Sequence, residues 1–128
     1  MYIEVLAVID EAAGLVDFVS PIGGAQGTWH SGRPPEPGHC HVELEAEAEP
    51  RSWKPSTARS PAIERTGAGT CQVRIAGTVV RVDDDAMMSL QVGSDIILVE
   101  LPGGSPAPHP GESVEFTLPG IGIYPYTL

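Results

Sequence analysis

Residues 70–101, TCQVRIAGTVVRVDDDAMMSLQVGSDIILVEL, decide the fold class of this chain. Apolar and polar residues largely alternate in three runs, and a period of two is typical of strands. The runs are joined by Asp83-Asp84-Asp85 and by Gly93-Ser94-Asp95, which both favour turns. Gly77, in the middle of the first run, predicts a bulge or a sharp bend. We therefore expect an antiparallel meander in this half of the chain.

The rest of the sequence carries the same pattern. Alternating runs recur between turn signals about every ten residues, and sustained helical periodicity is absent. Gly23-Gly24 predicts one of the turns, and residues 40–48 form the clearest strand of the first half. We therefore predict an all-β protein, a sandwich or compact barrel of about 7–9 short antiparallel strands.

Two short patterns recur at a spacing of seventy-three positions. Val8-Ile9-Asp10-Glu11 and Arg81-Val82-Asp83-Asp84 each open a turn, and Pro37-Gly38 and Pro110-Gly111 each lead into a strand. The strands that follow match only at a spacing of seventy-two. Such a pattern is the mark of an internal repeat. We expect one domain, residues 1–128, with a first β-unit at 1–49, a connecting segment at 50–69 and a second β-unit at 70–128.

Charge is spread unevenly along the chain. The net charge is −10, with −8 in residues 1–49, +3 in the proline-broken residues 50–70 and −5 in residues 71–128. This balance repels nucleic-acid phosphates and anionic membranes, so we expect no nucleic-acid or membrane partner, and it favours basic partners. A short helical turn is expected near residues 62–65.

The remaining compositional features bear on location. The chain starts without a basic segment typical of export signals, and no apolar run reaches membrane-spanning length. Cys40 and Cys71 are its two cysteines. We expect a cytoplasmic protein with reduced thiols. Its single Lys against six Arg hints at a bacterial, GC-rich genome.

The sharpest surface feature is a stripe of glutamates at alternate positions, Glu43, Glu45, Glu47 and Glu49. On a strand they share one face and stand roughly 6.5–7 Å apart. The stripe fits a solvated face, an edge protected against sticking to other strands, or internal pairing with arginines. It also fits a docking surface for a basic partner, with Trp29 or Trp53 as the apolar anchor.

Metal and catalytic sites find little support. His39 and His41 flank Cys40 and share one strand face, but zinc needs further ligands, such as His30 or His109. The aspartates 83–85 lack the spacing of a calcium loop and predict a hairpin turn. None of the common nucleophile, zinc-protease, phosphate-loop or dinucleotide motifs is present. We expect no cofactor, no metal, and a role other than catalysis.

In size, acidity and β-richness the chain resembles small immunity proteins of bacterial toxin systems. Residues 73–126 also resemble a small OB-like barrel unit, in the long bent strand with Gly77, the meander and the closing strand. The predicted function is a non-enzymatic, immunity- or inhibitor-like module that docks a basic partner through an acidic face. Two alternatives stay open. One is a small-molecule or metal-binding barrel with His39 and His41 lining a pocket; the other is a structural subunit of an assembly.

Overall fold

The computed structural model describes residues 1–57, 60–67, 72–103 and 106–127. Every regular element within these residues is a strand, which confirms the all-β prediction. The described strands number eleven, somewhat more than the 7–9 predicted, and two of them are short strands in the connecting segment. In chain order they are β1 (Tyr2–Asp10), β2 (Leu15–Ser20), β3 (Gly23–Trp29), β4 (Gly38–Ala46), β5 (Lys54–Pro55), β6 (Ala62–Arg65), β7 (Val73–Val82), β8 (Met87–Val92), β9 (Asp95–Glu100), β10 (Ser113–Leu118) and β11 (Ile121–Tyr126).

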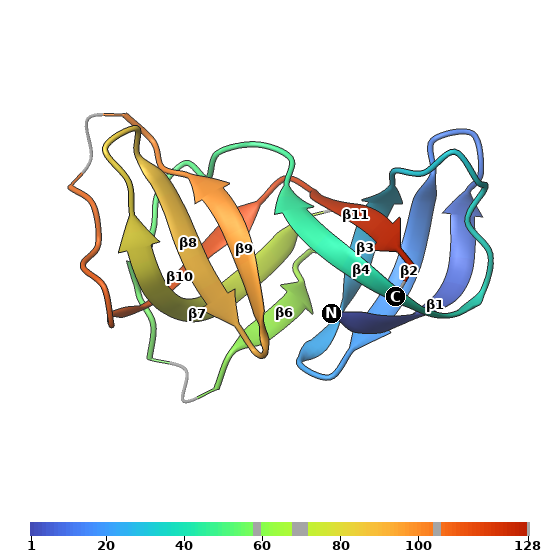
Figure 1. Ribbon diagram of the computed structural model, residues 1–128, viewed down its shortest axis with the longest axis horizontal. Coiled ribbons are helices and arrows are strands. Elements are labelled where there is room, and N and C mark those ends of the chain that lie inside the picture. Colours follow the sequence, from blue (N-terminus) through green and yellow to red (C-terminus); the bar gives the residue numbers. More distant parts are fainter. Residues whose placement is uncertain (58–59, 68–71, 104–105, 128) are drawn as a thin grey trace.

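The first sheet closes into a five-stranded barrel in the order β1-β2-β3-β11-β4 (Figure 1, right). Neighbours in it are antiparallel except β3 and β11, which run parallel where Ile123 pairs with Trp29. Alternate residues of each strand point inward, so that Val16, Phe18 and Val42 fill the barrel with almost no exposure. Of the predicted alternatives, a sandwich or a compact barrel, this sheet is a barrel, with one parallel pair that alternation alone could not reveal.

The second sheet stays open and has the order β5-β10-β7-β8-β9, with β6 also paired to β7 (Figure 1, left). Its inward side chains, among them Ile75, Leu90 and Val114, are fully buried. Ile63 of β6 packs in the same core and donates its backbone N–H to Ile22 O of the barrel at 3.2 Å. The core is therefore continuous between the two sheets.

Each half of the chain gives its last strand to the other sheet. β5, which follows β4, pairs with β10, and β11, which follows β10, pairs with β4. The red β11 accordingly lies among the blue and teal strands of the barrel (Figure 1). The grouping of strands into sheets thus differs from the expected β-units 1–49 and 70–128. We call β1–β4 with β11 the first unit, and β5–β10 the second unit.

The two units share one internal architecture. In each, three strands form a meander, β1-β2-β3 or β7-β8-β9, and a fourth strand pairs with the first of them. Leu15 pairs with Thr28, and Met87 with Glu100 seventy-two positions later. For β1 and β4 the offset to β7 and β10 is seventy-four, since Ile3 pairs with Cys40 and Gly77 with Val114. The spacing of seventy-three seen in the sequence lies between these two offsets.

The turns of the two units correspond as closely as their strand pairings do. Gly14 and Ala86, seventy-two positions apart, both adopt positive φ, 72° and 64°. Trp29 N–H donates to Gly14 O at 2.8 Å, and Leu101 N–H donates to Ala86 O at 2.9 Å. An alanine at positive φ is uncommon, so its presence at the glycine's position indicates that the shared turn geometry overrides local preference. The structure therefore contains a true internal repeat.

The position at which the barrel closes is occupied by different residues in the two units. The barrel closes where Gly122 and Ile123 of β11 meet β3. β5 corresponds to β11 at the offset of seventy-two, which places Pro50 where Gly122 stands. Pro50 is buried and, as a proline, has no backbone N–H with which to pair with β9. Among the described residues, β5 pairs only with β10.

Several local expectations are corrected. The helical turn near residues 62–65 is β6, whose alternate side chain Ile63 is buried. The turn expected at Gly23-Gly24 lies at Pro21-Ile22, where the Ser20 hydroxyl accepts a hydrogen bond from Ile22 N–H. The register shift of β7 lies between Val79 and Arg81 rather than at Gly77; a Cβ at Gly77 would lie 2.5 Å from Gln91 O, so the glycine permits a close strand approach.

Strand bounds also differ at the ends. β4 covers Gly38–Ala46 rather than residues 40–48. The strand expected at 70–82 is described from Val73 onward, and Cys71 lies outside the described residues. Cys40 is a free, half-buried thiol whose pKa is raised by burial.

Candidate functional site

The outer surface of the barrel carries an unusual set of side chains over β1, β4 and β11. Val42 and Leu44 point into the barrel, so the residues between them on β4 point outward. All three tyrosines of the protein and three of its four histidines gather here with glutamates. We call this surface the ring-and-acid face; it consists of Tyr2, Glu4, His30, His39, His41, Glu43, Glu45, Glu47, Tyr124 and Tyr126.

A row of rings crosses the three strands. Tyr2 stacks on His39 with ring centroids 5.4 Å apart, and it contacts His41 at 4.6 Å. His41 in turn lies 6.0 Å from the ring of Tyr126. Strand register produces the row, because His41 pairs with Tyr2 on one side and with Tyr126 on the other. The rings support one another and leave their outer surfaces to solvent.

A second ring pair stands beside this row. His30 stacks on Tyr124 with centroids 4.7 Å apart, and its Nε2 lies 3.0 Å from Glu47 Oε1. The His30 N–H donates to Ile123 O at 2.8 Å, which holds the loop after β3 against β11. Gly122 forms the floor, since a Cβ there would lie 3.0 Å from the Tyr124 ring and 3.3 Å from Glu47 Oε1. A residue without a side chain lets these groups converge.

Of the four carboxylates of the face, Glu4 and Glu47 each lie near a histidine, and the other two have no ion-pair partner within the described residues. Burial and then the carboxylates of Glu45 and Glu47 raise the pKa of the Tyr124 phenol. Glu4 lies 3.7 Å from His39 Nε2. In the described residues, neither Glu43 nor Glu45 forms an ion pair.

The predicted stripe is therefore exposed, but only half of it is on a strand. Glu43 and Glu45 lie on β4, whereas Glu47 and Glu49 follow its end. Internal pairing with arginines was one interpretation of the stripe. Arg74 instead pairs with Glu64 and Glu115, and Arg81 with Asp83.

A cleft runs along the stripe between β4 and β9, which pack against each other. Its opposite wall carries two apolar side chains, Ile96 and Leu98, that are 50% and 52% exposed. Two adjoining hollows make up the cleft. The first is lined by Met1, Glu43, Leu44, Glu45, Asp95, Ile96, Ile97, Leu98 and Tyr126, and the second by Glu45, Ala46, Glu47, Ala48, Glu49, Met87, Leu98 and Glu100.

Ile96 and Leu98 are site residues that sequence reasoning missed. The signal was present, because the run Ile96-Ile97-Leu98-Val99 is apolar on both strand faces. A strand of that kind normally has both faces covered by other elements. Here the inner face is buried and the outer face lines the cleft.

Trp53 lies away from the row of rings, whereas Trp29 lines a hollow together with His39 and Tyr126 of that row. Trp29 is half-buried against the core at the end of the barrel, and its Nε1–H donates to Arg33 O at 3.0 Å. Trp53 packs on the core in the second unit and donates to Pro106 O at 3.2 Å. It lines a separate hollow together with Glu49. Both indoles thus fasten loops to the body, and the structure does not bring them together with Glu43 and Glu45.

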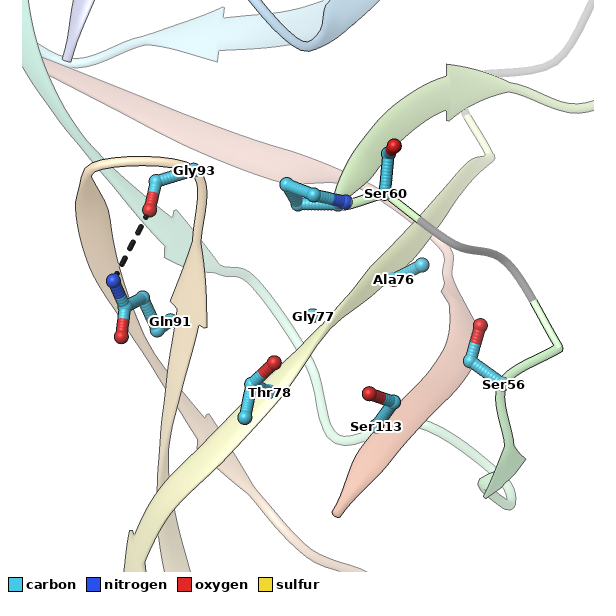
Figure 2. Close-up of a pocket in the computed structure, with 9 residues that line it drawn as sticks. Ser56, Ser60, Ala76, Gly77, Thr78, Gln91, Gly93 and Ser113 are labelled. Atoms are coloured by element: carbon cyan, nitrogen blue, oxygen red, sulfur yellow. Dashed lines mark hydrogen bonds between the residues drawn. The ribbon is translucent and has the colours of Figure 1, made fainter. Parts of the chain in front are cut away.

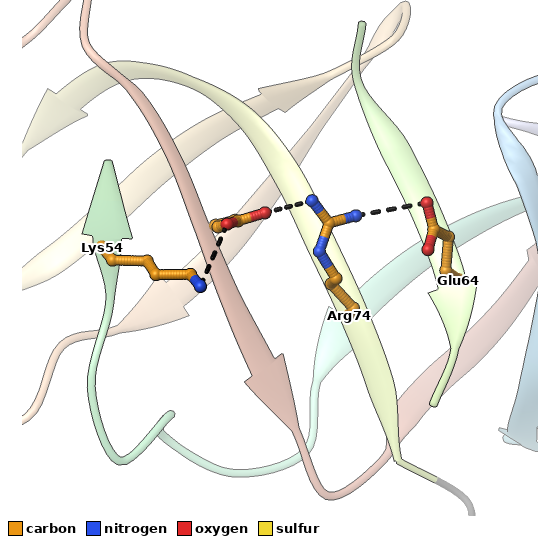
Figure 3. Close-up of polar contacts among 4 residues, drawn as sticks. Lys54, Glu64 and Arg74 are labelled. Atoms are coloured by element: carbon orange, nitrogen blue, oxygen red, sulfur yellow. Dashed lines mark hydrogen bonds and ion pairs between the residues drawn. The ribbon is translucent and has the colours of Figure 1, made fainter. Parts of the chain in front are cut away.

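The corresponding surface of the second unit is built differently. Glu115, the counterpart of His41, binds the Arg74 guanidinium and lies 3.5 Å from Lys54 Nζ (Figure 3). Arg74 Nη1 also lies 3.2 Å from Glu64 Oε1. The pKa of Glu115 is lowered, chiefly by its hydrogen bond from Arg74. The acids of this surface are neutralised within the protein.

Beside that network lies a hollow lined with hydroxyl groups (Figure 2). Ser56, Ser60, Thr78 and Ser113 border it, and Gln91 donates from Nε2 to Gly93 O at 3.3 Å on its rim. None of its lining residues carries an acid or base that titrates near neutral pH, so general acid–base chemistry has no donor there.

His39 and His41, the candidates for metal ligands, lie side by side on the ring-and-acid face. Tyr2 packs against both His39 and His41. In the part of the chain that the structure describes, no three or more His, Cys, Asp or Glu side chains are grouped to hold a metal ion. Asp83 pairs with Arg81 at 2.9 Å and Asp85 accepts from Met87 N–H at 3.4 Å, as in a hairpin turn.

The fold and this surface define an all-β protein with one closed barrel and one open sheet. Comparisons with protein-family models, with curated proteins and with solved structures found no match to this chain. Within the described ranges, no helix has the length and apolar character needed to cross a membrane.

Proposed function

We propose that this protein is a non-enzymatic binding module that docks a basic partner protein through the ring-and-acid face. One observation carries the proposal. The first unit collects rings and unpaired carboxylates on a surface whose counterpart in the second unit neutralises its own acids. An immunity- or inhibitor-like role in a bacterial cytoplasm is its concrete form.

The chemistry of the face suits arginine and lysine side chains. A guanidinium group stacks on aromatic rings and pairs with a carboxylate at the same time. The row Tyr2–His41–Tyr126 has Glu43 next to it on β4, so both contacts are available to one cation. Clustered negative charge also speeds the encounter with a positive partner.

The barrel order supports extending the OB-like resemblance to the first unit, whose fifth strand lies between the third and the fourth. Barrels of that kind often bind oligonucleotides. The ring-and-acid face disfavours such a ligand, because Glu43 and Glu45 would repel phosphates. We therefore propose a protein partner and no nucleic acid.

A matched pair of charge reversals tests the proposal. Glu43→Lys/Glu45→Lys reverses two exposed acids of the face, and Glu11→Lys/Asp84→Lys reverses two exposed acids elsewhere. Tagged wild type should capture a stoichiometric basic protein from its native lysate at low salt and lose it at high salt. The first variant should lose the partner and the second should keep it. Equal capture by both variants would contradict the proposal.

A second candidate, binding of a small polar molecule, is supported by the hydroxyl-lined hollow (Figure 2). Ligand binding raises the melting temperature by mass action. A metabolite screen by thermal shift should then give a hit that Thr78→Val removes, and a screen without one would count against this candidate. The third interpretation, a structural subunit, predicts a defined oligomer of the purified protein, which light scattering would detect.

A further inference from the structure

We infer that the cleft between β4 and β9 holds an extended segment of the partner, in which basic and apolar side chains alternate. The inference rests on the proposed function and specifies the chemistry of the docked segment. The two walls of the cleft differ in chemistry and would contact different side chains of a bound segment. One is acidic and carries Glu43 and Glu45, and the other is apolar and carries Ile96 and Leu98.

The internal repeat shows that the apolar wall is not required by the fold. At the offset of seventy-two, Ile96 and Leu98 of β9 correspond to Gly24 and Gln26 of β3. The same scaffold thus folds with no large apolar side chain at either position. Exposed isoleucine and leucine at both places in β9 are an addition to the shared architecture, and an apolar contact with a partner accounts for them.

The spacing on both walls matches an extended chain. Residues two apart on a strand are separated by roughly 6.5–7 Å, and the same distance separates alternate residues of an extended peptide. Glu43 and Glu45 therefore face every second side chain of a segment lying in the cleft. Ile96 and Leu98 face the side chains between them. A helical segment would not keep both contacts in step over the length of the cleft.

The second hollow lengthens the cleft with the same division of chemistry. Glu47 and Glu49 continue the acidic wall beyond the end of β4, and Met87 adjoins Leu98 on the apolar side. Glu100 marks the far end with one more acid. The whole cleft consequently favours a cationic segment over a neutral or acidic one.

Defined peptides test this inference with the full-length protein. The first probe is a labelled peptide of four Arg-Val repeats, and the second replaces every valine with serine. The two carry equal charge, so fluorescence anisotropy at low salt separates apolar from electrostatic binding. The Arg-Val peptide should bind at least about tenfold more tightly, which corresponds to about 1.4 kcal/mol. Equal affinities would overturn the inference.

Substitutions in the protein show whether the difference in affinity between the two peptides arises in the cleft. Ile96→Ser/Leu98→Ser should abolish the advantage of the Arg-Val peptide, while Leu6→Ser/Val80→Ser, at two other exposed apolar positions, should keep it. Both double variants remove exposed side chains, so both should fold; a thermal melt checks this. If Ile96→Ser/Leu98→Ser kept the advantage, the cleft would not be the binding place.

The two proposals fail in different ways. If both peptides bind equally and Glu43→Lys/Glu45→Lys abolishes binding, the acidic face docks basic partners but the segment in the cleft is wrong. If neither peptide binds, the inference is overturned, and the proposed function is decided by the charge reversals with the native lysate. If Ile96→Ser/Leu98→Ser weakens peptide binding and Glu43→Lys/Glu45→Lys does not, the proposed role of the acidic face is wrong.

Discussion

The first and second units share one five-stranded plan, to which the second adds β6, and they differ in closure and in charge. The first is a complete barrel because β11 fills the place between β3 and β4. In the second, β5 stops at β10 with Pro50 at the closing position. The first leaves the acids Glu43 and Glu45 without a cation among the described residues, and the second binds its acid Glu115 to Arg74 and Lys54. Comparing the two units therefore distinguishes the features that the shared fold requires from the features that only one unit has.

The largest difference should be in the strands that were exchanged. Ile123→Ala removes a fully buried side chain from β11 and should lower the free energy of unfolding by about 2–5 kcal/mol. Lys54→Ala in β5 removes a side chain that is 75% exposed and should cost far less. Denaturant unfolding of both variants makes the comparison. Equal losses would mean that β5 and β11 support their sheets equally.

A smaller effect is expected at the floor of the ring pair. Gly122→Ala places a methyl group 3.3 Å from His30 and 3.0 Å from Tyr124, so the stacked rings must move apart. We expect a loss of about 1 kcal/mol, because the obstructing atoms belong to side chains that can shift. Proton NMR should show the ring-current shifts of His30 and Tyr124 reduced. Unchanged shifts would show that the stack does not depend on the bare backbone.

The two surfaces should respond to opposite ends of the pH scale. Arg74 lowers the pKa of Glu115 in the folded state, so this contribution is complete above the unfolded pKa and is lost as pH falls through the folded pKa. Burial raises the pKa of Tyr124, so its contribution is complete below the unfolded pKa and is lost as pH rises through the folded pKa.

Melting temperature as a function of pH tests this difference. Glu115→Gln should flatten the acidic limb of the profile alone, and Tyr124→Phe should flatten the alkaline limb alone. A variant that altered the opposite limb would show that the two surfaces are electrostatically coupled.

The smallest effect is expected from neutralising one acid of the face. Glu43→Gln should change the free energy of unfolding by no more than about 0.5 kcal/mol, since the carboxylate is exposed and is not ion-paired within the described residues. Thermal unfolding checks this. A substantial loss would show that the carboxylate serves the fold and would weaken its assignment to binding.

The alternation of apolar and polar residues predicted most of the strands, and the strands that it did not predict have physical reasons. β7, β8 and β9 follow from their period of two and their turns, and so does the outward direction of Glu43 and Glu45. The exchange of β5 and β11 did not follow, because pairing between distant strands depends on the whole sheet and leaves no local period. β6 was misassigned because four residues are too few to distinguish a strand from a helical turn.

The candidate site was predictable in part for the same reason. The glutamate stripe is continuous in the sequence, with Glu43 and Glu45 on β4 and Glu47 and Glu49 directly after it, and can be recognised there. The rings come from β1, β4, β11 and the loop after β3, so they meet only once β4 lies between β1 and β11. Leu98 was recognisable as part of an apolar run, but the cleft that it lines exists only between two sheets.

The central claim, that the first unit's face docks a basic partner, is tested most directly by association kinetics. The rate constant for association of the captured partner should be measured for wild type and for Glu43→Lys/Glu45→Lys over a range of salt concentrations. We predict that the variant associates at least about tenfold more slowly at low salt and that its rate depends little on salt. An unchanged rate with an unchanged salt dependence would contradict the claim and leave the glutamate stripe a solvated face.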